Sequence, residues 1–559
     1  MIILPESLQQ IITPYLDLLI RWLGEQIYER MLRFHQKHLL YQIHKHLDFR
    51  ALEAACSGYH HQTGAGVKPT HRSSYLIRAL LIRYLYAMSY REVEAALQTN
   101  LLMRWFVGYG IFDAVLDHTT LERFEVWVCA NQHRSLFDVV LGQIDQDFPE
   151  ACQAEQIGDT FAMRANAAEE TLIQLLRHTG DCLLRELKRE SLRQYQQVMT
   201  GLDLGGLLGD PNESNLFYLD QEERGLRLQS TVFALLDLTE RVKQSGPLDQ
   251  LVRVQLRLED VDKILGDKLD LQKNADGQVE RVTRLPAKQQ GPYQIGSATD
   301  REATYRKHGE DYTLGYNISL SATKQGVIRE IQAATGAQPD QAGVASLIQE
   351  QVQQGYPCPP KLIYDQAAGA GKTRAEVARV SEGKTQLVAK IHTTAEVGRF
   401  GPQDFSLSSD GLSLTCPNGV VTRSRNRSGN RDGTHYNFSA TKCRGCPFWT
   451  HCRNEKAKPN RVRRVFISDY QEQVNAARTY NQTEAFRADM KLRPRIERIV
   501  FMLTNYDGAR RARTHGLQQA DFQAKLCATA RNLRTWIELL EARERRTQLI
   551  PRLESVGVR

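Results

Sequence analysis

The sequence of 559 residues lacks any long hydrophobic run. No stretch approaches the roughly 18 uninterrupted apolar residues that a membrane span requires, which argues against a membrane protein. The first 26 residues also lack the basic region of a signal peptide. They carry Glu6, Asp17 and Glu25 among apolar residues at helical spacing, and so predict an amphipathic helix.

A secreted disulfide framework is missing as well. The ten cysteines are mostly scattered, which favours a reducing compartment. Internal repeats and long low-complexity tracts are also absent. What is present is an ordinary globular composition, with 41% hydrophobic and 25% charged residues, and a length that suffices for about three or four domains.

Positive charge is concentrated in the C-terminal quarter. Residues 441–559 hold 25 Lys and Arg against 12 Asp and Glu, a net of +13, whereas the whole chain has a net of +8. The other 440 residues therefore sum to −5. This distribution indicates a polyanionic partner, with nucleic acid as the first candidate. A solubilising basic surface would give the same balance.

The N-terminal part is predicted to be helical. Residues 1–58 suggest two or three helices, and residues 59–149 contain a short Gly/Pro/His linker followed by further helices. Residues 73–110 and 117–128 show the spacing of a helix-turn-helix unit, so we expect a DNA-binding helical domain. An all-helical packing or dimerisation domain would show the same pattern.

Three helix starts can be predicted within this region. Ser73 or Ser74 is the expected N-cap of the first helix, and the second helix is expected to start at Ser89. Thr119 or Thr120 is the expected cap of a later helix, with an acidic residue close behind.

The middle of the chain changes from helices to strands. Residues 169–295 show heptad-like apolar spacing and predict an inserted helical hairpin. Residues 312–323 and 326–336 predict two paired strands, residues 341–355 a helix, and residues 358–365 a short strand. This alternation predicts a mixed α/β layer. Residues 381–487 predict a β-rich insertion, and helices return after residue 471.

Three acids are candidates for one metal site. Asp159 lies in a strand that begins with an apolar lead-in, Asp365 ends the strand KLIYD, and Glu497 lies in a helix with an apolar face. Two strand acids and a helix acid can converge on two Mg²⁺ ions about 3.5–4 Å apart. Taken singly, each of these acids would be a solvated or capping carboxylate.

Four of the ten cysteines fall within 37 residues and form a second candidate metal site. Four thiolates suit tetrahedral Zn²⁺, and Cys-x2-Cys is half of a zinc knuckle. His451 could replace one sulfur, and buried free thiols are the alternative. The four residues are Cys416, Cys443, Cys446 and Cys452.

The segment GAGKT (369–373) has some features of a phosphate-binding loop. The full motif requires a glycine at position 366, where this chain has Gln366. A nucleotide hydrolase is therefore disfavoured, and the segment is expected to lead from Asp365 into a helix.

Several segments together resemble the DDE-type transposases of bacterial insertion sequences. They are LYAMSYREVEAAL, RWFVGYG, DHTTLERF, IGDTFAMRANA, GYNISLSAT, LIYD, LRPRIERIVFMLTNYDGARRARTHGL and CATARNLRTWIELL. The block around Glu497 is the most specific of them. It keeps Arg493 four residues before Glu497, but has Met490 and Thr504 where related transposases often have Tyr and Lys.

The resemblance implies a mixed α/β fold with a ribonuclease-H-like catalytic core. We expect this core to comprise residues 150–168, 296–380 and 488–540, with a C-terminal tail at 541–559. The helical and β-rich segments described above would be insertions into it, and the N-terminal helices would form a DNA-binding domain.

The resemblance also implies a function. Asp159, Asp365 and Glu497 would hold two Mg²⁺ (or Mn²⁺) ions for cleavage at element ends and strand transfer. The partners would be double-stranded terminal repeats and target DNA, bound by a homodimer in the bacterial cytoplasm, near the nucleoid. A non-catalytic DNA-binding descendant is the alternative. The arginines expected to contact DNA are Arg493, Arg495, Arg498, Arg510, Arg511 and Arg513.

Overall fold

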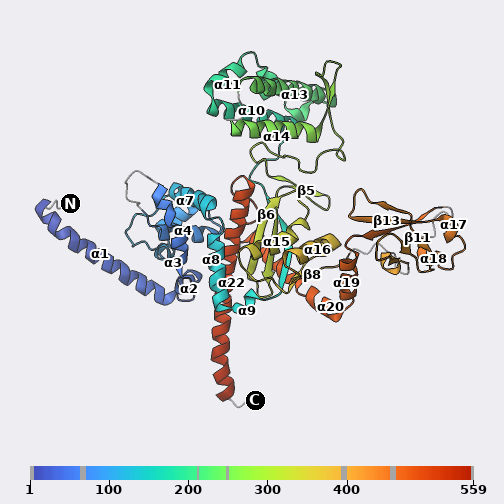
Figure 1. Ribbon diagram of the computed structural model, residues 1–559. Coiled ribbons are helices and arrows are strands. Elements are labelled where there is room, and N and C mark those ends of the chain that lie inside the picture. The colour runs from blue at the N-terminus through green and yellow to red at the C-terminus, as the bar shows by residue number, and fades with distance from the viewer. Residues whose placement is uncertain are drawn as a thin grey trace.

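A mixed β-sheet lies at the centre of the computed structural model, with separate units arranged around it (Figure 1). The structure describes residues 6–62, 71–210, 213–246, 251–391, 399–453 and 461–555. Figure 1 shows the N-terminal helices on one side, a helical bundle above the sheet, and a small β-rich unit on the opposite side.

The central sheet has the strand order β4-β5-β1-β7-β8, with β6 also paired to β5. β1 pairs antiparallel with β5 and parallel with β7, and β7 pairs parallel with β8. The sheet is therefore antiparallel on one side of β1 and parallel on the other. Its strands are β1 (Gln156–Arg164), β4 (Thr304–His308), β5 (Asp311–Thr323), β6 (Ile328–Thr335), β7 (Lys361–Ile363) and β8 (Gln386–Val388).

Helices cover both faces of this sheet, which confirms the mixed α/β class. α15 (Ala342–Gln353) and α16 (Gly371–Val380) pack on one face, in a core that includes Leu362 and Tyr364. The neighbouring Ile363 points to the other face, as the alternation along a strand requires. The predicted hairpin of β5 and β6 and the helix before β7 are confirmed.

The N-terminal helices share one hydrophobic core with the second face of the sheet. That core continues from Leu40 through α4 and α8 to β1, β5 and the C-terminal helix α22 (Leu517–Ser555). The N-terminal elements are α1 (Glu6–Phe34), α2 (Leu39–His46), α3 (Phe49–Ala55), η1 (Ser57–Gln62), α4 (Ser73–Leu85), α5 (Tyr90–Thr99), α6 (Leu101–Val107), α7 (His118–Asn131), α8 (Ser135–Asp147) and α9 (Pro149–Cys152).

One of the predicted helix starts is confirmed and two are wrong. Ser89 forms a full capping box at the start of α5. Arg72 occupies the N-cap position of α4, without a side-chain hydrogen bond. Asp117 caps α7 and accepts from the backbone N–H of Thr120, because it lies one position before the first helical turn.

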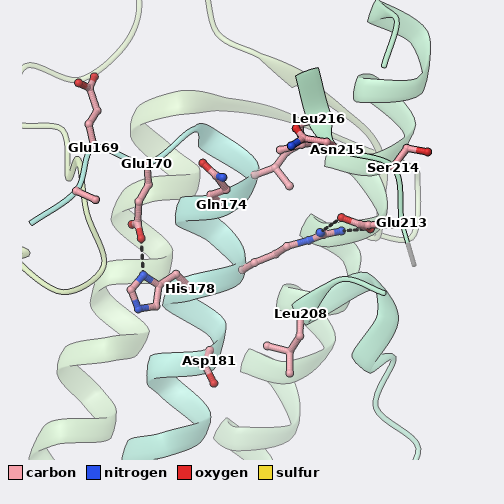
Figure 2. A pocket seen from close by; sticks show the side chains of 13 residues that line it. Glu169, Glu170, Gln174, His178, Asp181, Leu208, Glu213, Ser214, Asn215 and Leu216 are labelled. Atoms are coloured by element: carbon pink, nitrogen blue, oxygen red, sulfur yellow. Dashed lines mark hydrogen bonds and ion pairs between the residues drawn. The ribbon is translucent and has the colours of Figure 1, made fainter. Parts of the chain in front are cut away.

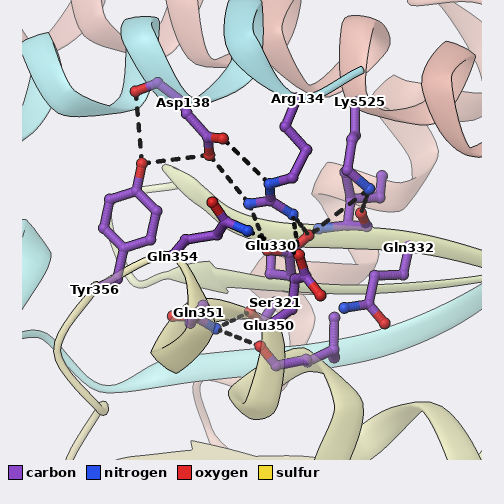
Figure 3. A network of polar contacts seen from close by, with 12 residues as sticks. Arg134, Asp138, Ser321, Glu330, Gln332, Glu350, Gln351, Gln354, Tyr356 and Lys525 are labelled. Carbon is purple, nitrogen blue, oxygen red and sulfur yellow. Dashed lines mark hydrogen bonds and ion pairs between the residues drawn. The ribbon is translucent and has the colours of Figure 1, made fainter. Parts of the chain in front are cut away.

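A network of polar contacts fastens the N-terminal helices to the sheet (Figure 3). Arg134, at the start of α8, makes two hydrogen bonds of 3.1 and 3.0 Å to the carboxylate of Glu330 on β6. It also contacts Glu350 of α15 at 3.2 Å. Lys525 of α22 lies 3.9 Å from Glu330. Four elements distant in sequence therefore meet at one buried carboxylate.

The insertion after β1 is a bundle with its own hydrophobic core, not the single hairpin predicted from the heptad-like spacing. Apolar periodicity marks helical faces but does not count the helices. Its elements are α10 (Leu172–Glu190), α11 (Leu192–Met199), α12 (Leu204–Leu208), η2 (Leu216–Tyr218), α13 (Gln221–Gln244), α14 (Val252–Lys268), β2 (Leu269–Lys273) and β3 (Val279–Arg284).

The second insertion is β-rich, as predicted, but its predicted start at residue 381 is too early. β8, at residues 386–388, is a strand of the central sheet. α19 packs on α16 of the main domain. The remaining elements are η4 (Gln366–Gly369), η5 (Pro402–Asp404), β9 (Ser406–Leu407), β10 (Leu414–Thr415), β11 (Val421–Thr422), β12 (Arg425–Arg427), β13 (Gly433–Phe438), α17 (Ala440–Cys443), α18 (Trp449–Cys452), β14 (Arg463–Ser468), α19 (Gln471–Asn481), α20 (Glu484–Met490) and α21 (Arg493–Asn505).

The first described helix, α1, confirms the predicted helix and projects from the body (Figure 1), with Leu16, Leu19 and Trp22 exposed. Among the described helices, none combines the length and the apolar composition needed to cross a bilayer.

Candidate functional site

Asp159 lies on β1, and Asp365 lies two residues past the end of β7, the parallel strand beside it. β1 and β7 are in register at Gln156 with Leu362 and at Ile157 with Ile363. Continuing this register by two residues places Asp159 opposite Asp365, at the strand spacing of about 4.8 Å. Both positions follow the face that carries Ile157 and Ile363, so the two carboxylates point to the same side of the sheet.

Local backbone contacts hold both carboxylates in place. Asp159 Oδ1 accepts the backbone N–H of Thr160 at 2.9 Å. Asp365 is the N-cap of η4 and accepts the backbone N–H of Ala367 at 3.0 Å. One oxygen of each carboxylate is thus used locally, and the other oxygen of Asp159 lies 3.3 Å from the Arg493 guanidinium.

The third acid, Glu497, lies on α21, which packs against β1. Ile496, Ile499 and Leu503 are the buried side chains that hold α21 on the core. Glu497 is 62% exposed, on the polar face of the helix. Its long side chain is therefore free to turn, whereas Asp159 is fixed in the sheet and only 18% exposed.

Arg493 lies between the acids from β1 and α21. Its Nη2 is 3.3 Å from Asp159 Oδ2 and 3.9 Å from Glu497 Oε1. Its Nη1 is buried and has no hydrogen-bond partner among the described residues. The guanidinium thus balances part of the negative charge of Asp159 and Glu497, and its Nη1 remains available as a hydrogen-bond donor.

The acids affect one another electrostatically. Burial raises the pKa of Asp159, the Arg493 guanidinium opposes this shift, and the charges of Asp365 and Glu497 add to it. The charges of Asp365 and Glu497 therefore reach Asp159. An added cation would relieve their repulsion.

Two residues that sequence reasoning missed support this pair of strands. The ring of Tyr364 is fully buried and lies over Gly158, where a Cβ atom would come within 2.4 Å of it. Burial raises the pKa of Tyr364 well above its ordinary value, and the charges of Asp159 and Asp365 raise it further. The signal was available in the sequence, because Gly158 and Tyr364 directly precede the two acids.

The donor set fits a hard divalent cation, since Mg²⁺ prefers a few carboxylate oxygens together with water. The side chains are not gathered around one point, however. Within the described ranges, no group of three or more His, Cys, Asp or Glu side chains is arranged to hold a metal ion. The carboxylate oxygens therefore suit Mg²⁺, but the exposed side chain of Glu497 would have to turn toward Asp159 and Asp365 to bind the same ion.

The remaining predicted DNA-contacting arginines differ in their surroundings. Arg498, Arg510 and Arg511 are exposed, and the backbone of Arg511 pairs with Arg164 at the end of β1. Arg495 is also exposed and donates to the backbone oxygen of Lys324 at 2.5 Å.

Arg513 is engaged within the protein. Its Nη1 donates to the backbone oxygen of Met88 at 3.1 Å, and its guanidinium lies 4.8 Å from the centre of the Tyr84 ring. It therefore ties the C-terminal turn to the N-terminal helices, which is a contact that sequence spacing could not reveal.

A groove of about 790 Å³ lies where the helical bundle joins β1, away from the three acids (Figure 2). Its charged side chains pair with one another, Glu170 with His178 and Arg177 with Glu213. Glu169 and Asp181 also line the groove, so acidic side chains outnumber basic ones there.

Cys416, Cys443, Cys446 and Cys452 all line one small cavity in the β-rich insertion. His451, the alternative ligand, is exposed, and its ring packs against Phe400. The structure thus brings the four cysteines together without His451.

The fold and the site define an α/β protein with carboxylates collected on one side of a mixed sheet. Comparison with known families is consistent with this class. Residues 28–126 match a family model described as a transposase domain (DUF772), and residues 415–537 match one described as a transposase DDE domain.

The two matches support a DDE-type transposase of an insertion sequence. The second match includes Glu497 and the cysteine cluster, but it begins after Asp159 and Asp365. Transposases bind DNA, which supports DNA as the partner of this chain. No curated protein and no solved structure matches it.

Proposed function

We propose that Asp159, Asp365 and Glu497 are the catalytic acids of this transposase. The observation that carries the proposal is the position of Asp159 on β1 and of Asp365 just past the end of the neighbouring parallel strand β7, with α21 packed against β1. The charges of Asp365 and Glu497 that reach Asp159 support it.

The strand order supports a ribonuclease-H-like core. Three antiparallel strands, β6, β5 and β1, are followed across the sheet by the parallel strands β7 and β8. This mixture of antiparallel and parallel strands fits the mixed sheet that the resemblance implies. The core then includes β8 and extends to about residue 390.

The reaction is cleavage at the element ends followed by strand transfer into target DNA. Two bound Mg²⁺ ions would activate the attacking water or 3′-hydroxyl and stabilise the leaving oxygen. Asp159 and Asp365 offer fixed oxygens from the sheet, whereas Glu497 offers an oxygen that can close on the site. Arg493 is placed to exchange its contact with Asp159 for a phosphate oxygen.

The exposed arginines supply the approach to DNA. Arg495 and Arg498 lie on α21 beside Glu497, and Arg510 and Arg511 follow the same helix, so phosphates would meet a continuous basic surface. Arg513 serves to hold this turn in place. We propose that two copies act together on the element ends in the bacterial cytoplasm, close to the nucleoid.

Strand nicking on DNA that carries the ends of the encoding element tests the proposal. Wild-type protein with Mg²⁺ should nick this DNA, and Asp159→Asn and Glu497→Gln should lose nicking while retaining DNA binding. Asp276→Asn, at an exposed hairpin turn of the bundle, is the matched carboxylate control and should nick normally.

Two outcomes would contradict the proposal. Full nicking by Asp159→Asn would remove this acid from the site. Specific DNA binding by the wild type without nicking at any divalent-metal concentration would favour the non-catalytic descendant.

A further inference from the structure

The four cysteines of the β-rich insertion surround a cavity whose size suits a single ion. About 30 Å³ of it is open to a water-sized sphere, and one such sphere needs about 10–15 Å³. The cavity is therefore too small for an organic ligand. The cysteines that line it are Cys416, Cys443, Cys446 and Cys452.

Two tight turns supply three of these cysteines. Cys416 begins the turn between β10 and β11, closed by the 2.9 Å hydrogen bond from its N–H to the oxygen of Val420. Cys443 and Cys446 flank a second turn, in which the N–H of Cys446 donates to the oxygen of Cys443 at 3.2 Å. Gly445 in this turn has a φ of +77°, which allows the two cysteines to approach the same cavity.

The charges around the cavity are unbalanced if the cysteines are neutral thiols. Arg453 is only 6% exposed and lines the cavity, and its Nη2 has no hydrogen-bond partner among the described residues. Arg463 lines it as well, half-buried, and no carboxylate does. A buried cation needs a compensating negative charge, and four thiolates around one divalent ion would supply a net charge of −2.

The unit also has little else to stabilise it. Its core has six buried apolar side chains, and β9, β10 and β11 are two residues each. Units with so small a core usually depend on disulfides or a metal. All four cysteines are unpaired thiols here, which leaves them available as ligands.

We propose that these four cysteines bind one structural Zn²⁺, independently of the catalytic acids. The sulfurs are not gathered into a metal-binding group in this structure. Binding therefore draws them toward one point, about 2.3 Å from each, and releases protons as the thiols ionise. Four thiolates leave no open position for water, so the ion holds the two turns together and takes no part in the reaction.

Metal analysis of the full-length chain, purified under reducing conditions, tests the proposal. About one zinc per chain is expected, and the double substitution Cys443→Ser/Cys446→Ser should reduce it at least tenfold. Cys182→Ser is the matched control, since this half-buried cysteine lies in the helical bundle and should leave the zinc content unchanged.

A measurement on the wild type alone tests the proposal even if the double variant misfolds. Titration with a mercurial thiol reagent should release the zinc in step with four thiols, and Co²⁺ in its place should show the visible absorption of a tetrahedral thiolate site. Zinc near zero after reconstitution, zinc retained by the double variant, or iron with labile sulfide in its place would each overturn the proposal.

Discussion

The substitution Arg134→Ala should loosen the junction between the N-terminal helices and the sheet. It removes both hydrogen bonds to the carboxylate of Glu330, which is fully buried on β6. Breaking a buried ion pair costs about 3–5 kcal/mol because it leaves an uncompensated charge. Lys525 remains 3.9 Å away and compensates in part, so we expect the lower end, about 3 kcal/mol.

Amide hydrogen exchange is the suitable assay, because a chain with several units does not unfold in one step. A loss of about 3 kcal/mol corresponds to roughly a hundredfold faster exchange. The increase should appear in β6 and at the start of α8, and the α10 bundle should be unaffected.

The matched control is Arg185→Ala. Arg185 pairs with Asp181 on the surface of α10 and is 72% exposed, so its loss should cost less than about 1 kcal/mol. The double substitution Arg134→Met/Glu330→Met removes both charges and should recover most of the protection. Equal exchange in Arg134→Ala and Arg185→Ala, or no recovery in the double variant, would refute the reasoning.

Acidification offers a further check on the same junction. Burial raises the pKa of Glu330, and Lys525 and Arg134 lower it. Without Arg134 this pKa should rise further, and the carboxyl should take up a proton at mildly acidic pH. The exchange defect of Arg134→Ala should therefore be smaller near pH 5 than at pH 8.

Three further predictions concern the site. Gly158→Ala forces a methyl group against the buried Tyr364 ring, so it should lower the free energy of unfolding by about 1–3 kcal/mol and reduce nicking. Thermal unfolding and the nicking assay measure the two effects, and unchanged stability would contradict the packing. Burial raises the pKa of Asp159 above 3.8, so the folded chain binds the carboxyl proton of Asp159 more tightly than the unfolded chain does. The protonated carboxyl therefore favours the folded state fully below pH 3.8, and this contribution to stability is lost as pH rises through the folded pKa. In the absence of metal, Asp159→Asn should therefore raise the melting temperature more at pH 7 than at pH 4, and an equal change at both values would contradict this. Arg510→Ala/Arg511→Ala should flatten the salt dependence of DNA affinity by about 0.9 for each lost phosphate contact, whereas Arg513→Ala should mainly destabilise the N-terminal junction.

The central strands could be predicted because their signals are local. The β5–β6 hairpin follows from two β-branched runs with a short turn, and the helix after it from apolar spacing and a terminal Gly355. β8 was missed because its three residues form no pattern; it is a strand only because β7 offers it a partner.

The caps of α4 and α7 show a different limit. Several residues near each helix start can accept a backbone hydrogen bond, and geometry decides among them. At α7 the threonine hydroxyls of Thr119 and Thr120 donate to Asp117, which is the residue that caps the helix.

The residue types of the candidate site, and part of its geometry, could be predicted from the sequence. The strand contexts of Asp159 and Asp365 and the helix context of Glu497 predict that the three acids converge on one metal site. The contact of Arg493 with Asp159, and that of Arg513 with Tyr84, join residues hundreds of positions apart. No local pattern encodes such contacts.

The helix α22 has a consequence for how the chain is made. It packs on β6, α8 and α4, so the core shared by the N-terminal helices and the sheet is closed by a helix that is synthesised after all of them. At about 5–20 residues per second, the roughly 350 residues between β1 and α22 take about 20–70 s to emerge. During that time β1 and α8 lack their final packing surface. A chain whose translation stops before residue 517 therefore lacks α22, and its core stays open. We expect proteases to degrade such a chain, and we expect it to have no partial activity.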